Sequence, residues 1–150
     1  MTPADAKRRL LWQGMLIFGL GLLTGAVVPV MTNPRMGVAA HVGGVMSGMF
    51  LILVGLLWDQ IKLSLRAEKA AFWFFLYAAY AGWLAQLLAA WFGTSRATPI
   101  AGAGYRGAAW QENLVWFVAI SFSIAVSLAC LLALWGSKKK VLVSLFAAGA

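Results

Sequence analysis

The chain has 150 residues, of which 63% are hydrophobic and 11% are charged, and its mean hydropathy is +0.86. A soluble domain is about half apolar and about a quarter charged, so this composition excludes an ordinary soluble protein and predicts an integral membrane protein of one domain. The net charge of +8 would suggest nucleic acid in a soluble protein. Here the cations lie between the apolar runs and at the termini, so we expect contact with membrane lipid and no nucleic-acid partner.

Four apolar runs are long enough to cross a bilayer, which takes about 20 residues. Backbone polar groups in lipid must be satisfied within the segment, so each run is expected to be an α-helix. The predicted fold is therefore all-α, a four-transmembrane-helix bundle forming a single membrane domain over residues 1–150. The helices are expected at residues 10–30, 38–58, 70–92 and 114–135, followed by a basic tail at 136–150.

The cationic side chains are divided unequally between the two ends of these runs. Nine of the twelve Lys and Arg residues precede the first run, separate the second from the third, or follow the fourth. By the positive-inside rule, this pattern predicts a multi-pass protein of the inner (cell) membrane with both termini in the cytoplasm. Tryptophans near the predicted helix ends, among them Trp12, Trp58 and Trp135, are typical of an interfacial aromatic belt.

The connection between the third and fourth runs, residues 93–113, is the longest and is rich in Gly, Ala, Ser and Thr. A long loop without secondary structure of its own is often a lid or a binding loop. A flexible connector has the same composition, so both interpretations stay open.

His41 is the only histidine, and it lies in the first turns of the second predicted helix. An ionisable side chain at membrane depth is costly, so by default it marks a candidate functional site. On a helix, His41 shares one stripe with Gly44 and Gly48. These glycines either let another helix approach closely or leave a bare wall for a flat macrocycle, with His41 as a haem axial ligand. A lone histidine cannot build a closed zinc site, which needs about four ligands.

Other polar residues are candidates because they lie toward the same outward end of the predicted bundle. Glu112, at the head of the fourth helix, is either a carboxylate favoured by the helix dipole or a counter-charge for His41. Asn113 and Gln86 can bind a small polar ligand or hydrogen-bond between helices.

Two sets of larger side chains also allow two interpretations each. Met46 and Met49, on the His41 helix, are either core filler or a second axial ligand. Tyr77, Tyr80 and Trp83 repeat at spacings of three and form a face for an aromatic ligand or for lipid and helix packing.

The sequence resembles the hydroxylaminobenzene mutases in several motifs. These are NPRMG at 33–37, His41 with GMFL at 48–51, GLGLLTG at 19–25, and AWQE at 109–112. The His41 segment is more distantly similar to styrene oxide isomerase, a trimeric four-helix membrane enzyme whose haem b is ligated by a histidine in the matching helix.

This resemblance implies a membrane isomerase, an intramolecular mutase that converts hydroxylaminobenzene-type arylhydroxylamines to 2-aminophenols, as in nitroaromatic degradation. It implies haem b as cofactor, with His41 on the iron and Gly44 and Gly48 against the macrocycle, and a homotrimer. The alternatives are a related epoxide isomerase that converts styrene oxide to an aldehyde, or a non-enzymatic haem-binding or small transport protein.

The catalytic residues expected on this basis are Ser47, Gln86, Tyr80, Glu112 and Asn113. The related segments have an asparagine six residues after the histidine, where this chain has Ser47. Serine lacks the reach and the amide of asparagine, so the substrate or the rate is expected to differ. No motif matches the active-site tyrosine of the isomerase, for which Tyr77, Tyr80 and Tyr105 are candidates.

Overall fold

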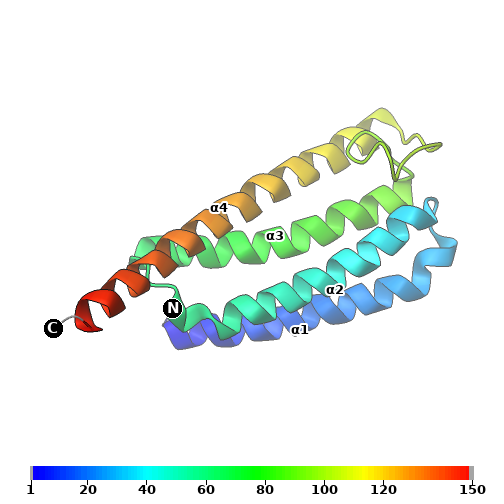
Figure 1. The fold of residues 1–150 in the computed structure, drawn as a ribbon. Coiled ribbons are helices and arrows are strands. Elements are labelled where there is room, and N and C mark those ends of the chain that lie inside the picture. The colour runs from blue at the N-terminus through cyan, green and yellow to red at the C-terminus, as the bar shows by residue number, and fades with distance from the viewer. Residues whose placement is uncertain (1, 149–150) are drawn as a thin grey trace.

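The computed structural model describes residues 2–148, with side chains described for residues 2–137, and four α-helices make up most of it (Figure 1). No strand occurs among the described residues. All four helices are long and apolar enough to cross a membrane, so the predicted all-α, four-helix architecture is confirmed. The helices are α1 (Pro3–Val27), α2 (Pro34–Leu56), α3 (Leu65–Phe92) and α4 (Ala109–Ala148), and short 3₁₀ helices follow α1 at Val28–Val30 and α2 at Trp58–Gln60.

Each helix begins earlier than its apolar run predicts, and for the first three helices polar side chains cap the extension. Thr2 and Asp5 form a capping box at the start of α1. Asn33 caps α2 through its Oδ1, which accepts a hydrogen bond from the backbone nitrogen of Met36 at 3.3 Å, and Ser64 caps α3. Such caps satisfy backbone N–H groups that the first turn leaves free, so these helices extend beyond the stretch that the bilayer requires.

The last two helices end differently. Helix α3 ends at Phe92, as predicted, because Gly93 follows with a φ of 63°, a left-handed conformation that glycine adopts at little cost. Helix α4 passes through Gly136 and continues to Ala148, so the tail predicted from residue 136 is helical that far. A single glycine inside a helix costs only about 1 kcal/mol. The last two residues of the predicted tail, 149–150, lie outside the described residues.

Helices α1 and α2 pack against each other through glycines. A Cβ added at Gly21 would lie 2.5 Å from the backbone nitrogen of Val45, and one added at Gly48 would lie 2.7 Å from the carbonyl oxygen of Gly14. A side chain at either position would force the backbones apart, so these glycines set the distance between the two helices. The packing interpretation of the glycine stripe is therefore confirmed.

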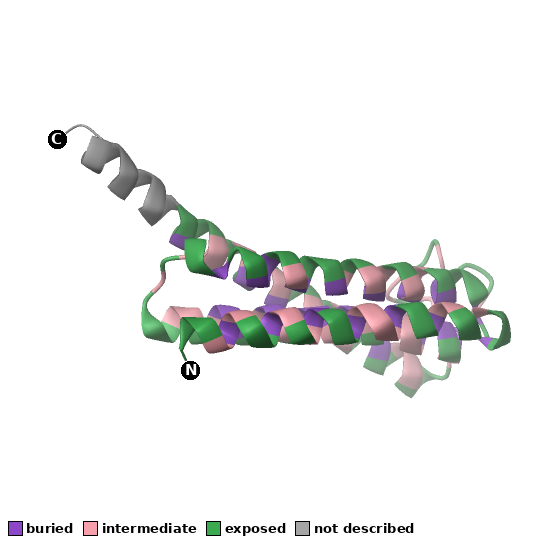
Figure 2. Ribbon diagram, turned by 90° about the horizontal axis from the view of Figure 1, so that it is seen from below, coloured by how far each residue is buried: buried purple, intermediate pink, exposed green. Residues whose placement is uncertain are grey.

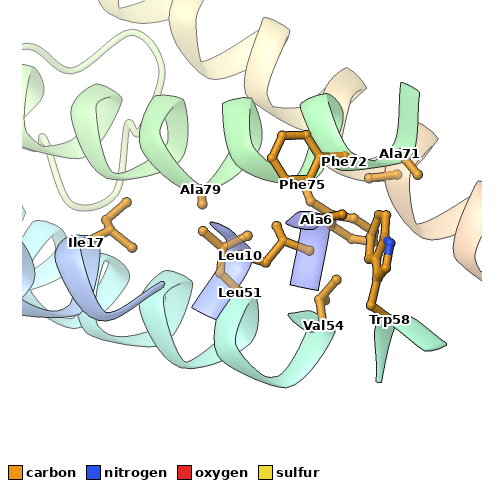
Figure 3. Packing of buried hydrophobic residues seen from close by; sticks show 11 residues of the cluster. Ala6, Leu10, Ile17, Leu51, Val54, Trp58, Ala71, Phe72, Phe75 and Ala79 are labelled. Atoms are coloured by element: carbon orange, nitrogen blue, oxygen red, sulfur yellow. The ribbon is translucent and has the colours of Figure 1, made fainter. Parts of the chain in front are cut away.

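Helix α3 lies between the α1–α2 pair and α4 (Figure 1). Within the described residues, the backbone of α4 comes close to α3 and the 58–60 turn but not to α1 or α2. Buried side chains therefore follow the interior faces of the first three helices, while the outer faces are exposed (Figure 2). The main apolar cluster includes Leu10, Leu51, Trp58 and Phe72 (Figure 3).

Contacts between the connections place the start of α1 and the Gly136 turn of α4 at the same end of the bundle. The Nζ of Lys7 donates to Asp59 Oδ2 at 2.8 Å, and the backbone nitrogen of Lys62 donates to the carbonyl oxygen of Gly136 at 3.3 Å. This agrees with an even number of spans. The side of the membrane that this end faces stays a prediction from the charge pattern.

Candidate functional site

His41 lies where α2 meets α1, and its imidazole is held by two α1 glycines. Its Nδ1 is 2.8 Å from the carbonyl oxygen of Gly21. A Cβ added at Gly25 would lie 2.8 Å from the same Nδ1 and 3.1 Å from Cε1. A carbonyl oxygen only accepts hydrogen bonds, so Nδ1 carries a hydrogen, and in the neutral imidazole the lone pair is then on Nε2. The glycines of α1 thus fix both the tautomer and the orientation of the ring.

This arrangement fits a metal-ligating histidine. Such a histidine commonly donates its second ring N–H to a backbone carbonyl, which orients the ring and raises the basicity of the ligating nitrogen. His41 can therefore supply one ligand to a metal through Nε2. Within the described residues, no group of three or more His, Cys, Asp or Glu side chains stands close enough to hold a bare metal ion.

The surroundings of His41 correct two expectations. Gly44 faces the Cα of Gly21 and the indole of Trp83 at distances that leave no space for a methyl group, so within this chain it presents no bare wall to a macrocycle. Gly48 is covered by α1 in the same way. Met46 and Met49 have 63% and 50% of their surface exposed, so their interpretation as core filler is wrong, and they lie on the outer face of α2.

The aromatic residues of α3 form links between helices rather than one ligand face. Trp83 packs against Gly44, and Gln86 packs against the adjacent Gly43. Each of the three polar aromatic side chains hydrogen-bonds to another helix: Trp83 Nε1 donates to Thr24 Oγ1 at 3.1 Å, Tyr80 OH donates to Gln13 Oε1, and Tyr77 OH pairs with Ser121 Oγ at 2.7 Å.

Glu112 anchors the long loop that precedes α4. Its carboxylate accepts hydrogen bonds from the backbone nitrogens of Ser95 at 3.1 Å, Arg96 at 2.9 Å and Gly107 at 3.0 Å. Asn113 Oδ1 accepts from the guanidinium of Arg96. Both predicted catalytic residues therefore bind the loop, and the hydrogen bonds of Glu112 go to the loop backbone rather than to His41.

Helix α2 holds the same loop from its other side. Asn33, which is fully buried, donates from Nδ2 to the carbonyl oxygen of Ala101 at 3.1 Å. The guanidinium of Arg35 donates to the carbonyl oxygen of Ala103. These contacts hold the loop in place on both sides, so they favour a lid or binding loop over a flexible connector.

Gln86 lines a cavity of about 210 Å³ beneath that loop. Its Nε2 donates to the carbonyl oxygen of Gly82 at 3.2 Å, and its amide lies where a Cβ at Gly43 would be only 2.7 Å away. Ser47 borders a separate, smaller cavity of about 40 Å³ between α2, α3 and α4. The structure therefore distributes the predicted residues over several places instead of gathering them around His41.

The sequence interpretation missed Gly21 and Gly25 as the residues that position His41. The available signal was their spacing of four in an apolar helix, which is typical of close helix packing. The spacing by itself does not reveal which residue on the opposite helix faces these glycines.

Four membrane-length helices with one oriented imidazole and an apolar cavity define a membrane-embedded bundle suited to a small apolar substrate. A protein-family model described as styrene oxide isomerase matches residues 6–138. The chain belongs to the styrene oxide isomerase family, and it is a membrane isomerase.

Two relatives come from Ectopseudomonas oleovorans. The chain is 50% identical to hydroxylaminobenzene mutase HabB over 136 residues, which is 90% of this chain and 83% of the relative. It is 41% identical to hydroxylaminobenzene mutase HabA over 124 residues, which is 82% of this chain and 92% of the relative. No solved structure shows a significant match to the chain.

Proposed function

We propose that the chain is an intramolecular mutase that converts hydroxylaminobenzene, or a close arylhydroxylamine, to the 2-aminophenol. The observation that carries this proposal is the 50% identity to the mutase HabB over 90% of the chain. In this reaction the N–O bond breaks and the oxygen joins the ortho carbon of the ring, whose proton is lost while the nitrogen gains one. Substrate and product are isomers, so no external oxidant or reductant is consumed.

The proposal includes haem b as the cofactor, which His41 would hold through Nε2. Bound there, its iron would supply a Lewis acid for the oxygen that leaves nitrogen. The carbonyl oxygen of Gly21 lies 2.8 Å from Nδ1 and accepts its hydrogen, so Nε2 is the nitrogen of the neutral ring that can bind the iron. In a site closed to water by lipid or by a second copy of the chain, polar groups near the reacting oxygen would act more strongly on developing charge than they do in solvent.

We further propose a homotrimer in the inner (cell) membrane, with both termini in the cytoplasm. The outer face of α2 beside His41 supports a covering partner, because Val38, Val42, Met46 and Met49 are all exposed there. A second copy of the chain packed on this face would enclose the ligating side of the imidazole. An arylhydroxylamine is apolar enough to enter such a site from the lipid.

The family model favours a second substrate, styrene oxide, which would be isomerised to an aldehyde. An assay with both substrates separates the two activities. Purified protein in nanodiscs, expressed with haem supplied, is given hydroxylaminobenzene or styrene oxide, and the products are separated chromatographically.

We expect the wild type to form 2-aminophenol. His41→Ala should form none, although its circular dichroism shows the same helix content as the wild type. Aldehyde from styrene oxide, without 2-aminophenol, would replace the mutase with the epoxide isomerase. Full mutase activity in His41→Ala would contradict the role of the imidazole.

A further inference from the structure

The cavity beneath the loop at residues 94–108 has the size of a small aromatic molecule. It lies between α3 and α4, with α2 contributing Met36 at its edge and Ala97 and Thr98 of the loop above it. Its volume is about 210 Å³, whereas an apolar cavity of about 150 Å³ is large enough to bind benzene. There is room here for one substituted ring.

The polar groups of the cavity are few and neutral. The Nε2 of Gln86 donates within α3 to Gly82, and among the described residues its Oε1 accepts no hydrogen bond. The hydroxyl of Ser123 donates to the carbonyl oxygen of Ala119 at 2.9 Å, which leaves its oxygen as an acceptor. No charged side chain lines the cavity. The lining therefore favours a neutral ring that carries N–H or O–H donors and disfavours an anion.

The walls of the cavity are fixed before any ligand arrives. A Cβ at Gly82 would lie 2.8 Å from the ring of Phe122, so this glycine lets the phenyl group pack closely against α3. The loop above is tied to α4 by Glu112 and to α2 by Asn33. A preformed site binds without first ordering its own walls, which is a cost that weakens flexible sites.

This cavity and His41 lie on different sides of α2. The amide of Gln86 lies against Gly43, while the imidazole of His41 faces Gly21 and Gly25 of α1. Residues two apart in a helix point to nearly opposite sides. The cavity is therefore separate from the imidazole.

We propose that this cavity is a second binding site, which takes a small neutral aromatic molecule with an N–H or O–H donor. Its natural ligands would be arylhydroxylamines or aminophenols, an assignment that rests on the proposed function. The size of the ring and the need for a donor come from the cavity itself. The ring lies between α3 and α4, and its donor binds Gln86 Oε1. The ligand enters and leaves through the bilayer.

The test uses 4-fluoroaniline, a neutral aromatic amine that has no N–O bond to rearrange. Its ¹⁹F resonance is followed during titration into nanodiscs that contain the full-length protein, and empty nanodiscs give the linear partitioning into lipid. We expect saturable binding to the wild type. Ala119→Leu, which fills the cavity, should abolish it, and Gln86→Leu should weaken it about three- to tenfold, the usual effect of one hydrogen bond.

The matched control is Ala133→Leu, another half-buried alanine of α4, which lines a different groove near Cys130. Binding should survive Ala133→Leu. It should also survive His41→Ala, which separates this site from any binding of the amine at the imidazole or at a haem.

Three results would overturn the proposal: no saturable binding to the wild type, binding lost in Ala133→Leu but kept in Ala119→Leu, or binding lost in His41→Ala. If the wild type binds 4-fluoroaniline but forms no 2-aminophenol, only the proposed reaction is wrong. If the wild type forms 2-aminophenol but shows no saturable binding of 4-fluoroaniline, only this second site is wrong.

Discussion

Gly25→Ala tests whether α1 positions the imidazole of His41. The added methyl group would lie 2.8 Å from Nδ1, and an ordinary contact begins near 3.4 Å, so the ring must move by about 0.6 Å, the difference between the two. The hydrogen bond from Nδ1 to Gly21, now 2.8 Å, would then approach or exceed the usual limit of about 3.2 Å.

The energies predict different effects on stability and on activity. Crowding costs about 1–3 kcal/mol, and the weakened hydrogen bond costs up to about 1 kcal/mol. The higher helix propensity of alanine returns up to about 1 kcal/mol. The net change in unfolding free energy should be small, about 1–3 kcal/mol. A misplacement of about 1 Å at a catalytic group can lower the rate about 100-fold, so for a movement of about 0.6 Å we expect kcat to fall at least about tenfold.

The assay is formation of 2-aminophenol, with thermal melting in detergent measured on the same samples. Gly19→Ala is the matched control, because a Cβ there meets nothing within 4 Å and the residue lies in the same helix. It should be fully active and at least as stable as the wild type. If Gly25→Ala is as active as Gly19→Ala, the glycine does not position the imidazole and the reasoning from these distances is wrong.

Three further outcomes follow from the contacts. Glu112→Ala removes the acceptor of three loop N–H groups, and hydrogen exchange at residues 94–108 should increase at least tenfold while α1 and α2 keep their protection. Ser47→Asn should fold with a melting temperature within about 2 °C of the wild type, because a cavity of about 40 Å³ adjoins the side chain, and a changed KM would show that the position contacts substrate. The hydrogen bond from Lys7, and then its charge, lower the pKa of Asp59 below its ordinary 3.8. The ionised Asp59, paired with Lys7, therefore stabilises the fold above pH 3.8, and this stabilisation is lost as the pH falls through the lower, folded-state pKa. The acid-induced decrease in melting temperature should be smaller in Asp59→Asn.

The four spans could be predicted because a membrane helix is determined mainly by the length of an apolar run. The resemblance to the mutases and to styrene oxide isomerase is likewise confirmed by the comparisons. The helix ends were less well predicted, since capping by Thr2, Asn33 and Ser64 extends helices through polar residues that hydropathy assigns to loops.

The arrangement of the candidate site could be predicted only in part. His41 was identified because a lone imidazole at membrane depth is unusual. Its partners belong to α1, and which α1 residues face it depends on the packing of Gly21 against Gly44. Glu112 was placed correctly at the head of a helix. Its binding to three loop nitrogens depends on a backbone conformation that no residue pattern specifies.

The central claim is an intramolecular transfer of oxygen that depends on His41. Hydroxylaminobenzene labelled with ¹⁸O on nitrogen, incubated with the protein in unlabelled water, tests it most directly when the mass of the 2-aminophenol is measured. The account predicts that the product keeps the label in its ring hydroxyl group and that His41→Ala forms no labelled product. Product that carries oxygen from water, or labelled product formed equally well by His41→Ala, would contradict it.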